Sequence, residues 1–227
     1  LAALGEMAAA VAHEVRNPLG AIRLFLSLLR EDIADAPHSV RMIDEMERSV
    51  HTLDSLVTNI LQFSRGMQIV REPLNLSHLI NEQIAYVRKT GSVTASISTE
   101  LTEDDRIAGD AGALKQVLYN LLLNATQALA RAGTKVPRIL IVTRADSDGY
   151  EIRCEVNGPG VPLEIRATVF DPFVTTRNEG TGLGLAVVKQ IIERHQGSIR
   201  VEESATLGGA AFIIFLPRRG RVTVGES

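Results

Sequence analysis

Residues 10–20 read AVAHEVRNPLG, and this stretch lies inside a long helical pattern. Apolar residues recur through the pattern at spacings of three, four and seven, which is typical of a helix with one buried stripe. The stripe consists of Leu4, Ala8, Val11, Val15, Ile22, Phe25, Leu29 and Ile33. At about 100° per residue, His13 lies roughly 200° from both Val11 and Val15, so we expect its imidazole to point toward solvent.

Two further polar residues accompany this histidine. Asn17 is one helical turn further on, on nearly the same face, and Glu14 flanks that face. Pro18 follows directly, although proline inside a helix removes a backbone hydrogen bond and costs about 3 kcal/mol. A neutral imidazole beside a carboxylate suits nucleophilic or proton-transfer chemistry near neutral pH. The alternative is an ordinary solvated helix face; the position of Pro18 favours a functional site.

Residues 13–19, HEVRNPL, resemble the H-box of bacterial sensor histidine kinases. In that family the histidine takes the γ-phosphoryl group of ATP and passes it to an aspartate of a response regulator. The resemblance implies that His13 is the phospho-acceptor and that Glu14 accepts or orients its proton. It also implies that Asn17 orients water for the reverse, phosphatase reaction, and that the receiver domain of a response regulator is a partner.

Composition narrows the class of protein. The 227 residues carry 24 Lys or Arg against 27 Asp or Glu, a balance that argues against a nucleic-acid partner. The single cysteine, Cys154, fits a reducing cytosol, so we expect a cytoplasmic location. The sequence has no signal peptide and no apolar run long enough to span a bilayer. Because it begins inside a helical pattern, we expect a missing N-terminal part that carries a sensor domain or a membrane anchor.

A second helical pattern predicts a hairpin. We expect the first helix over residues 1–34, a turn over 35–39, and a second helix from Val40 to about Arg65. Two helices of about thirty residues, each about 45 Å long, must run antiparallel when a short turn joins them. A lone hairpin buries its stripes poorly, so the pattern predicts a homodimeric four-helix bundle. Packing of the hairpin on the C-terminal half of its own chain is the alternative.

The composition changes after the hairpin. We assign residues 1–68 to a dimerisation and histidine-phosphotransfer hairpin, 69–75 to a linker, 76–218 to an α+β domain with a mixed sheet, and 219–227 to a flexible tail. Asp110 is the expected N-cap of the central helix. Helices are expected at 76–88, 110–128 and 185–195, and strands at 93–99, 106–108, 137–144, 150–156, 198–202 and 210–216.

The central helix carries three amides on one face, at Asn120, Asn124 and Gln127, with leucines on the other. Asparagine is a poor helix former, so two of them in mid-helix need a reason. Amide oxygens are hard, neutral ligands that suit Mg²⁺ already carrying phosphate oxygens; two solvated amides are the alternative. The motif resembles the N-box of the GHKL ATPases, which implies Asn124 as the Mg²⁺ ligand, Asn120 assisting and Gln127 near the phosphates.

Three further motifs follow in the order that this superfamily uses. Residues 157–161, NGPGV, come directly after a strand and resemble the G1 box that cradles adenine, with Gly158 and Gly160 as its glycines. Residues 170–177, FDPFVTTR, resemble the F-box of a mobile lid, in which Phe173 and Arg177 lie near the nucleotide. Residues 180–185, GTGLGL, enter a helix and resemble the G2 box. The triphosphate contacts implied there are Gly180, Thr181, Gly182, Leu183 and Gly184.

The resemblance therefore covers nearly the whole chain. It implies an all-α hairpin followed by a GHKL, or Bergerat-type, α+β sandwich, with ATP and Mg²⁺ as cofactors. The expected activity is that of a protein-histidine kinase, with phosphatase activity on the regulator as a further expectation. We interpret His195 as structural.

One position departs from the family pattern. The G1 box normally begins with an aspartate that accepts a hydrogen bond from the adenine amino group, and here Val156 stands in its place. Leaving that donor unpaired costs about 1.5–3 kcal/mol, or roughly 10- to 100-fold in ATP affinity. A deliberate substitution, a naturally degenerate kinase and an acceptor from another residue all fit the sequence; strand alternation directs Glu155 to the opposite face. The competing functions are a phosphatase or scaffold that binds nucleotide poorly and a GHKL ATPase without histidine transfer.

Overall fold

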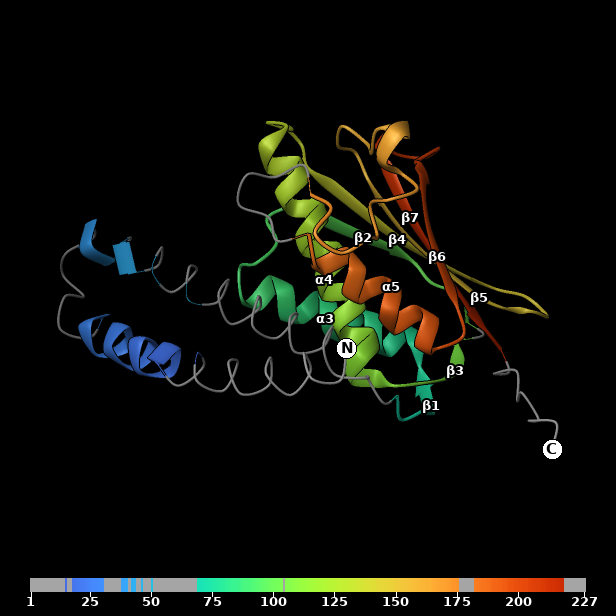
Figure 1. The fold of residues 1–227 in the computed structure, drawn as a ribbon, viewed down its shortest axis with the longest axis horizontal. Coiled ribbons are helices and arrows are strands. Elements are labelled where there is room, and N and C mark those ends of the chain that lie inside the picture. Colours follow the sequence, from blue (N-terminus) through green and yellow to red (C-terminus); the bar gives the residue numbers. More distant parts are fainter. Residues whose placement is uncertain are drawn as a thin grey trace. The chain divides into compact units, whose positions relative to one another are not determined.

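A computed structural model describes residues 15, 18–30, 38–40, 42–43, 46, 50, 69–103, 105–175 and 182–218. The chain divides into two compact units, Leu1–Met67 and Gln68–Ser227. Figure 1 shows both units along the chain, coloured by sequence. Among the described residues, no helix is both long enough and apolar enough to cross a membrane.

The first unit is helical wherever it is described. Residues 18–30 form one helix, and described residues between 38 and 50 are helical too. His38 and Ser39 already belong to this second segment, so the turn expected over 35–39 ends earlier than predicted. The two segments share a small core, so they pack on one another. That core consists of Leu19, Leu26, Ile43 and Val50, with Val15 packed against it.

Only part of the apolar stripe predicted for the first helix is buried within the hairpin of a single chain. Ile22, Phe25 and Leu29 are exposed, whereas the buried residues are Leu19 and Leu26. The exposed residues lie about 60–120° round the helix from the buried stripe. Both rows are apolar and interleaved, so periodicity alone does not tell which row faces the second helix of the same chain.

The second unit is an α+β domain built on a mixed five-stranded sheet, as predicted. The strand order is β2-β4-β5-β7-β6, in which β2 runs parallel to β4 and the other neighbours are antiparallel. The strands are β2 (Ser96–Glu100), β4 (Arg138–Ala145), β5 (Gly149–Val156), β6 (Ser198–Glu203) and β7 (Ala210–Pro217). A short 3₁₀ helix, η1 (Leu163–Ile165), lies in the long connection after β5.

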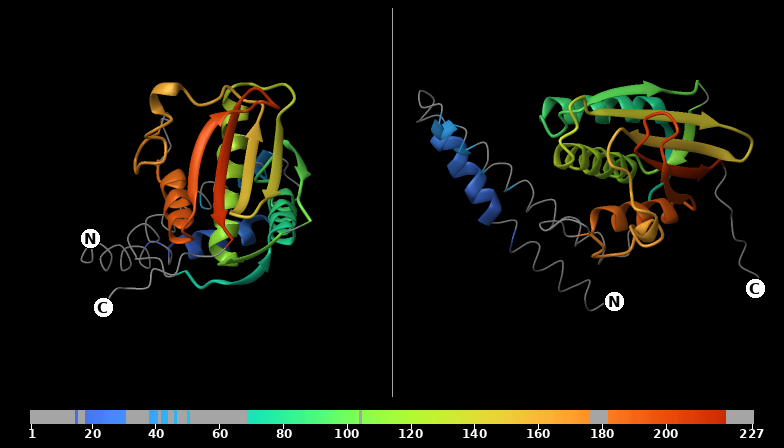
Figure 2. Two further views of the ribbon diagram at one scale, coloured as in Figure 1. Left: turned by 90° about the vertical axis from the view of Figure 1, so that its right-hand side faces the viewer. Right: turned by 90° about the horizontal axis from the view of Figure 1, so that it is seen from above.

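Three helices cover one face of this sheet, as the two views in Figure 2 show. They are α3 (Leu76–Lys89), α4 (Ala111–Arg131) and α5 (Gly184–Arg194). The strands alternate, so every second side chain points at the helices. The core on this side includes Ile139 and Ile141 of β4, Ile152, Cys154 and Val156 of β5, and Phe212 and Ile214 of β7, all buried.

Charged side chains cover the opposite, open face of the sheet. Arg153 contacts Glu155 at 3.0 Å, and Arg200 of β6 reaches Glu151 of β5 at 3.7 Å. Because β7 lies between these two strands, the Arg200–Glu151 pair spans it, and Ile213 of β7 is fully buried. The open face is thus protected from solvent by long polar side chains rather than by a second layer.

Part of the predicted linker belongs to this domain. Glu72–Asn75 form strand β1, which pairs antiparallel with β3 (Arg106–Gly109). Pro73 is compatible with a strand here because β1 has only one neighbour. Asn75 also caps α3, since its Oδ1 accepts the backbone N–H of His78 at 2.6 Å. The domain boundaries assigned from sequence otherwise stay a prediction.

The entry to the second unit is held against two helix ends. The backbone N–H of Val70 donates to Oδ2 of Asp110, whose Oδ1 caps α4 as predicted by accepting from Ala113. Arg71 donates to the carbonyl oxygen of Arg194 at 2.9 Å and to Oε1 of Gln196 at 3.3 Å. The chain therefore enters this unit across the start of α4 and the end of α5.

Candidate functional site

The central helix α4 carries the amides of the predicted site. Asn120 is only 8% exposed, and its Nδ2 has no hydrogen-bond partner among the described residues. Asn124 and Gln127 are partly buried. A buried amide without a partner costs about 1–3 kcal/mol. For Asn120 the alternative of a solvated surface amide is therefore wrong, and the orphaned group fits a site whose occupant is not part of the chain.

The first turn of α5 lies beside these amides. A Cβ on Gly184 would come within 3.6 Å of Asn120 Oδ1 and 3.8 Å of Asn124 Nδ2. The N-cap residue of α5, Leu183, makes no side-chain capping bond, so the described residue at this position leaves the first backbone N–H groups of the helix available. Such N–H groups attract anions, and amide oxygens suit a hard cation. The residues present therefore fit both a phosphate chain and Mg²⁺.

Gly182 places the segment before α5 against the lid sequence. Its φ is +66°, and a Cβ there would lie 2.5 Å from the carbonyl carbon of Phe173. The backbone N–H of Phe173 donates to the carbonyl oxygen of Gly182 at 3.2 Å. Only glycine allows this close approach with a positive φ. Phe173 of the predicted F-box and Gly182 of the predicted G2 box, nine positions apart in the chain, are thus brought together in the fold.

The two phenylalanines of the predicted lid differ in environment. Phe170 is buried and packs edge-to-face on Phe212, with ring centroids 6.3 Å apart. Phe173 is 71% exposed and has a positive φ of 66°. Between them, Asp171 pairs with Lys189 of α5 at 3.7 Å. Phe170 is therefore a core residue, whereas Phe173 is available to an external group.

The predicted G1 box leaves the sheet at the end of β5. Val156 is 3% exposed and pairs with Ile139 of β4. Asn157 fixes the strand end, because its side chain accepts from the N–H of Arg138 at 2.7 Å and donates to the carbonyl oxygen of Val136 at 2.8 Å. Both the oxygen and the nitrogen of the Asn157 amide thereby have hydrogen-bond partners within the chain. A Cβ added to Gly158 would meet only apolar groups, the Leu129 Cδ2 methyl at 3.5 Å and the Val156 Cγ2 methyl at 3.9 Å.

Six predicted site residues lie outside the described residues. They are His13, Glu14 and Asn17 of the H-box, and Arg177, Gly180 and Thr181 of the lid and G2 box. Their assigned roles remain predictions. The predicted site residues that the structure does describe lie between Asn120 and Gly184. They fall on α4, at the end of β5 and on the segment that enters α5.

Two neighbours of the G1 box were not predicted from sequence. Gly209, in the turn before β7, packs so closely that a Cβ would overlap the Val156 carbonyl oxygen and lie 2.6 Å from Gly158 N. Leu129 of α4 lies next to Gly158, where a side-chain Cβ would come within 3.5 Å of its Cδ2 methyl. The Gly208-Gly209 pair signals a turn, but nothing in the sequence tells which distant loop that turn contacts.

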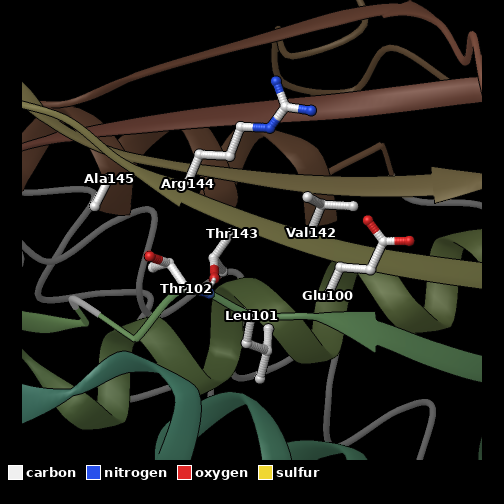
Figure 3. Close-up of a pocket in the computed structure, with 7 residues that line it drawn as sticks. All are labelled: Glu100, Leu101, Thr102, Val142, Thr143, Arg144 and Ala145. Atoms are coloured by element: carbon white, nitrogen blue, oxygen red, sulfur yellow. Dashed lines mark hydrogen bonds between the residues drawn. The ribbon is translucent and has the colours of Figure 1, made fainter.

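A shallow hollow elsewhere in the domain is a separate feature (Figure 3). It lies along the end of β2 and the far end of β4, where the Thr102 N–H donates to Thr143 Oγ1 at 2.9 Å. Because Val156 pairs with Ile139 at the other end of β4, this hollow is not part of the predicted nucleotide site. Its lining residues are Glu100, Leu101, Thr102, Val142, Thr143, Arg144 and Ala145.

Two buried titratable residues of this domain, Cys154 and His195, have structural roles. Burial raises the pKa of the Cys154 thiol to about 12, so this cysteine is a neutral core residue. Burial lowers the pKa of His195, whose Nε2 accepts from the Asp110 N–H at 3.0 Å and whose Nδ1 contacts the Ile191 carbonyl oxygen at 2.8 Å. His195 therefore joins the end of α5 to the start of α4, in agreement with a structural role. Among the described residues, no three His, Cys, Asp or Glu side chains form a metal site.

Comparison with known proteins decides the family. Residues 3–69 match the model of the His Kinase A (phospho-acceptor) domain. Residues 109–220 match the model of the histidine kinase-, DNA gyrase B- and HSP90-like ATPases. The chain belongs to the bacterial two-component sensor histidine kinases.

Individual members of the sensor histidine kinases resemble the chain over nearly all of its length. It is 39% identical to the signal transduction histidine-protein kinase AtoS of Escherichia coli (strain K12), over 96% of this chain and 35% of AtoS. Full-length ShkA in complex with AMPPNP gives a TM-score of 0.69 at 26% identity, over 95% of this chain and 47% of ShkA. Histidine kinase ThkA in complex with the response regulator TrrA gives 0.62 at 30% identity, over 95% of this chain and 62% of that chain. The chain spans about a third to a half of the curated relatives AtoS and ZraS.

Proposed function

We propose that this chain is the core of a sensor kinase that phosphorylates its own His13 from ATP and passes the phosphoryl group to an aspartate of a response regulator. The observation that carries the proposal is the buried Nδ2 of Asn120, which has no partner among the described residues and lies beside the first turn of α5. An orphaned N–H donor next to the backbone N–H groups of a helix start supports an anionic ligand such as a triphosphate, and the oxygens of the same amides suit its Mg²⁺. The match to AMPPNP-bound ShkA supports the same ligand class.

The chemistry assigned to the hairpin is an in-line displacement. The Nε2 lone pair of neutral His13 attacks the γ-phosphorus, an N–P bond forms, and the P–O bond to the leaving ADP breaks. Glu14 accepts or orients the remaining imidazole proton. Catalysis consists mainly of positioning and charge neutralisation, as in phosphoryl transfer generally.

The nucleotide domain supplies the positioning. Asn124 and Asn120 would hold Mg²⁺, which supplies charge neutralisation on the phosphates when bound, and Gln127 lies one turn beyond. The backbone from Gly180 to Gly184 contacts the triphosphate, and Phe173 and Arg177 close over it. Val156, Gly158 and Gly160 contact the base.

Two partners belong to this proposal. The hairpin buries Leu19 and Leu26 within the chain but leaves Ile22, Phe25 and Leu29 exposed, which supports a second copy that completes a four-helix bundle. The ThkA–TrrA complex supports a receiver domain as the second partner. Asn17 serves the phosphatase reaction on that receiver.

One assay tests the function. The chain is incubated with γ-labelled ATP and Mg²⁺, and we expect acid-labile, base-stable label that His13→Gln abolishes. ATP turnover without label on His13 would instead identify a plain ATPase. Neither label nor turnover, together with binding to a receiver domain, would identify a scaffold and contradict the proposal.

A further inference from the structure

The turn between β6 and β7 is closed by its own hydrogen bonds. The backbone N–H of Ser204 donates to the Gly209 carbonyl oxygen at 2.6 Å, and the N–H of Gly208 donates to the Ser204 carbonyl oxygen at 2.9 Å. The N–H of Leu207 donates to the Ser204 hydroxyl oxygen at 2.8 Å. Residues 204–209 therefore form a hydrogen-bonded turn in which Ser204 takes part in every one of these bonds.

A carboxylate on the neighbouring part of the sheet holds this turn. Ser204 is 2% exposed, and its hydroxyl donates to Oε2 of Glu155 at 2.6 Å. Glu155 is 3% exposed, and its Oε1 accepts from Arg153 Nε at 3.0 Å. Burial raises the pKa of Glu155, but hydrogen bonds from Ser204, Arg153 and Thr206 outweigh burial and leave that pKa below its ordinary value. Glu155 is thus an ionised acceptor, and the Ser204 hydroxyl is the donor.

The same turn packs against the backbone of the predicted G1 box through Gly209. Gly209 lies so close to the Val156 carbonyl oxygen and to the Gly158 backbone that no Cβ fits between them. Gly160, with a φ of +77°, also has the Gly209 carbonyl carbon 3.9 Å from where its Cβ would lie. The position of Gly209 therefore fixes how residues 156–160 leave the sheet.

We propose that Glu155 and Ser204 are positioning residues for nucleotide binding, which hold the 204–209 turn against the G1 box from the open side of the sheet. Neither side chain touches the nucleotide; Glu155 acts through Ser204, and Ser204 acts through Gly209. This inference rests on the proposed function, because the loop it positions is the one assigned to the base. It assigns a role to the two most deeply buried polar groups of the open face.

The test measures the Kd of ATP·Mg²⁺ by calorimetry and the Tm of the nucleotide-free protein. We expect Ser204→Ala to raise the Kd about fivefold, because a charge-assisted hydrogen bond at the loop support is lost. Ser204→Thr keeps the hydroxyl and restores the Kd to within about twofold. Glu155→Gln, which keeps the side-chain shape, raises the Kd by a similar factor. Each variant is made in the chain as it stands and with Val156→Asp, which brings the affinity into easy range.

Glu151→Gln is the matched control. Glu151 lies on the same strand and the same face, and it pairs with Arg153 and Arg200 but not with the turn. We expect its Kd to stay within about twofold. A lower Tm with an unchanged Kd in Ser204→Ala would overturn the positioning role, as would equal losses in Glu151→Gln and Glu155→Gln. Absence of ATP binding in every form, with or without Val156→Asp, would overturn the proposed function itself, and the inference with it.

Discussion

The two ends of the candidate nucleotide site differ in how they treat polar groups. At the phosphate end, Asn120 keeps a buried amide without a partner beside the start of α5. At the base end, Val156 is buried opposite Ile139 in the β4–β5 pair, and the side chain of Asn157 satisfies the strand end. The phosphate end thus contains a buried hydrogen-bond donor that a ligand would satisfy, whereas the Asn157 amide at the base end already has its hydrogen-bond partners within the chain. Val156 therefore fits the fold well, although it offers no hydrogen-bond acceptor to the base that the resemblance assigns there.

The largest effect is expected at the phosphate end. Asn124→Ala removes the amide assigned to Mg²⁺, and we expect labelling of His13 from γ-labelled ATP to fall about a hundredfold or more. Asn81→Ala, at an exposed amide on α3, is the control and leaves labelling unchanged. Normal labelling of His13 in the Asn124→Ala variant would show that this amide does not hold Mg²⁺ at the phosphate end.

Val156→Asp sharpens the comparison at the base end. Restoring an acceptor for the adenine amino group should tighten ATP binding at least tenfold, measured by calorimetry. The same change places a carboxylate at a buried position, so the Tm of the nucleotide-free protein should fall. Val156→Ile, which stays apolar, should change neither the affinity nor the specificity. Equal ATP affinity of the unchanged chain and the Val156→Asp variant would show that this residue does not face the base.

Gly182→Ala tests the contact between lid and helix start. The added Cβ meets the Phe173 backbone at 2.5 Å and also opposes the positive φ, so we expect the free energy of unfolding to fall by about 2 kcal/mol and ATP affinity to drop several-fold. Gly91→Ala is the matched control, since Gly91, just after α3, has a φ of +65° with open space around it. A drop of equal size in both variants would mean that backbone conformation alone, and not the Phe173 contact, matters.

The smallest effect concerns His195, at the far end of α5. Because burial lowers its pKa in the folded state, the unfolded chain binds the extra proton first as the pH falls. The contribution of neutral, buried His195 to the free energy of unfolding should therefore be constant above about pH 6.5. Below that pH it should decline, by at most about 1.4 kcal/mol per pH unit. Urea melts at several pH values measure this decline, and His195→Gln should flatten it, whereas replacing the exposed His78 should not.

Local pattern was sufficient for most of the second unit. Periodicity and turn residues locate the Asp110 cap and the helix α4 that follows it. They also locate the strands of the mixed sheet to within about three residues. The misses share one cause, which is contact between distant segments. Glu72–Asn75 look like a linker because only pairing with β3 makes them a strand, and Asn120 looks solvated until α5 is placed beside it. Ser204 and Glu155 are 49 residues apart, and no local signal joins them.

The anchoring of α5 at both ends has a mechanical consequence. Its eleven residues make a rod about 16 Å long. One end abuts the Asn120 and Asn124 amides, and the other is gripped by Arg71, just inside the point where the chain arrives from the helical hairpin. The segment by which the chain enters the second unit and the first turn of α5 are thus the two ends of one continuous connection, made of two side-chain hydrogen bonds and an eleven-residue helix.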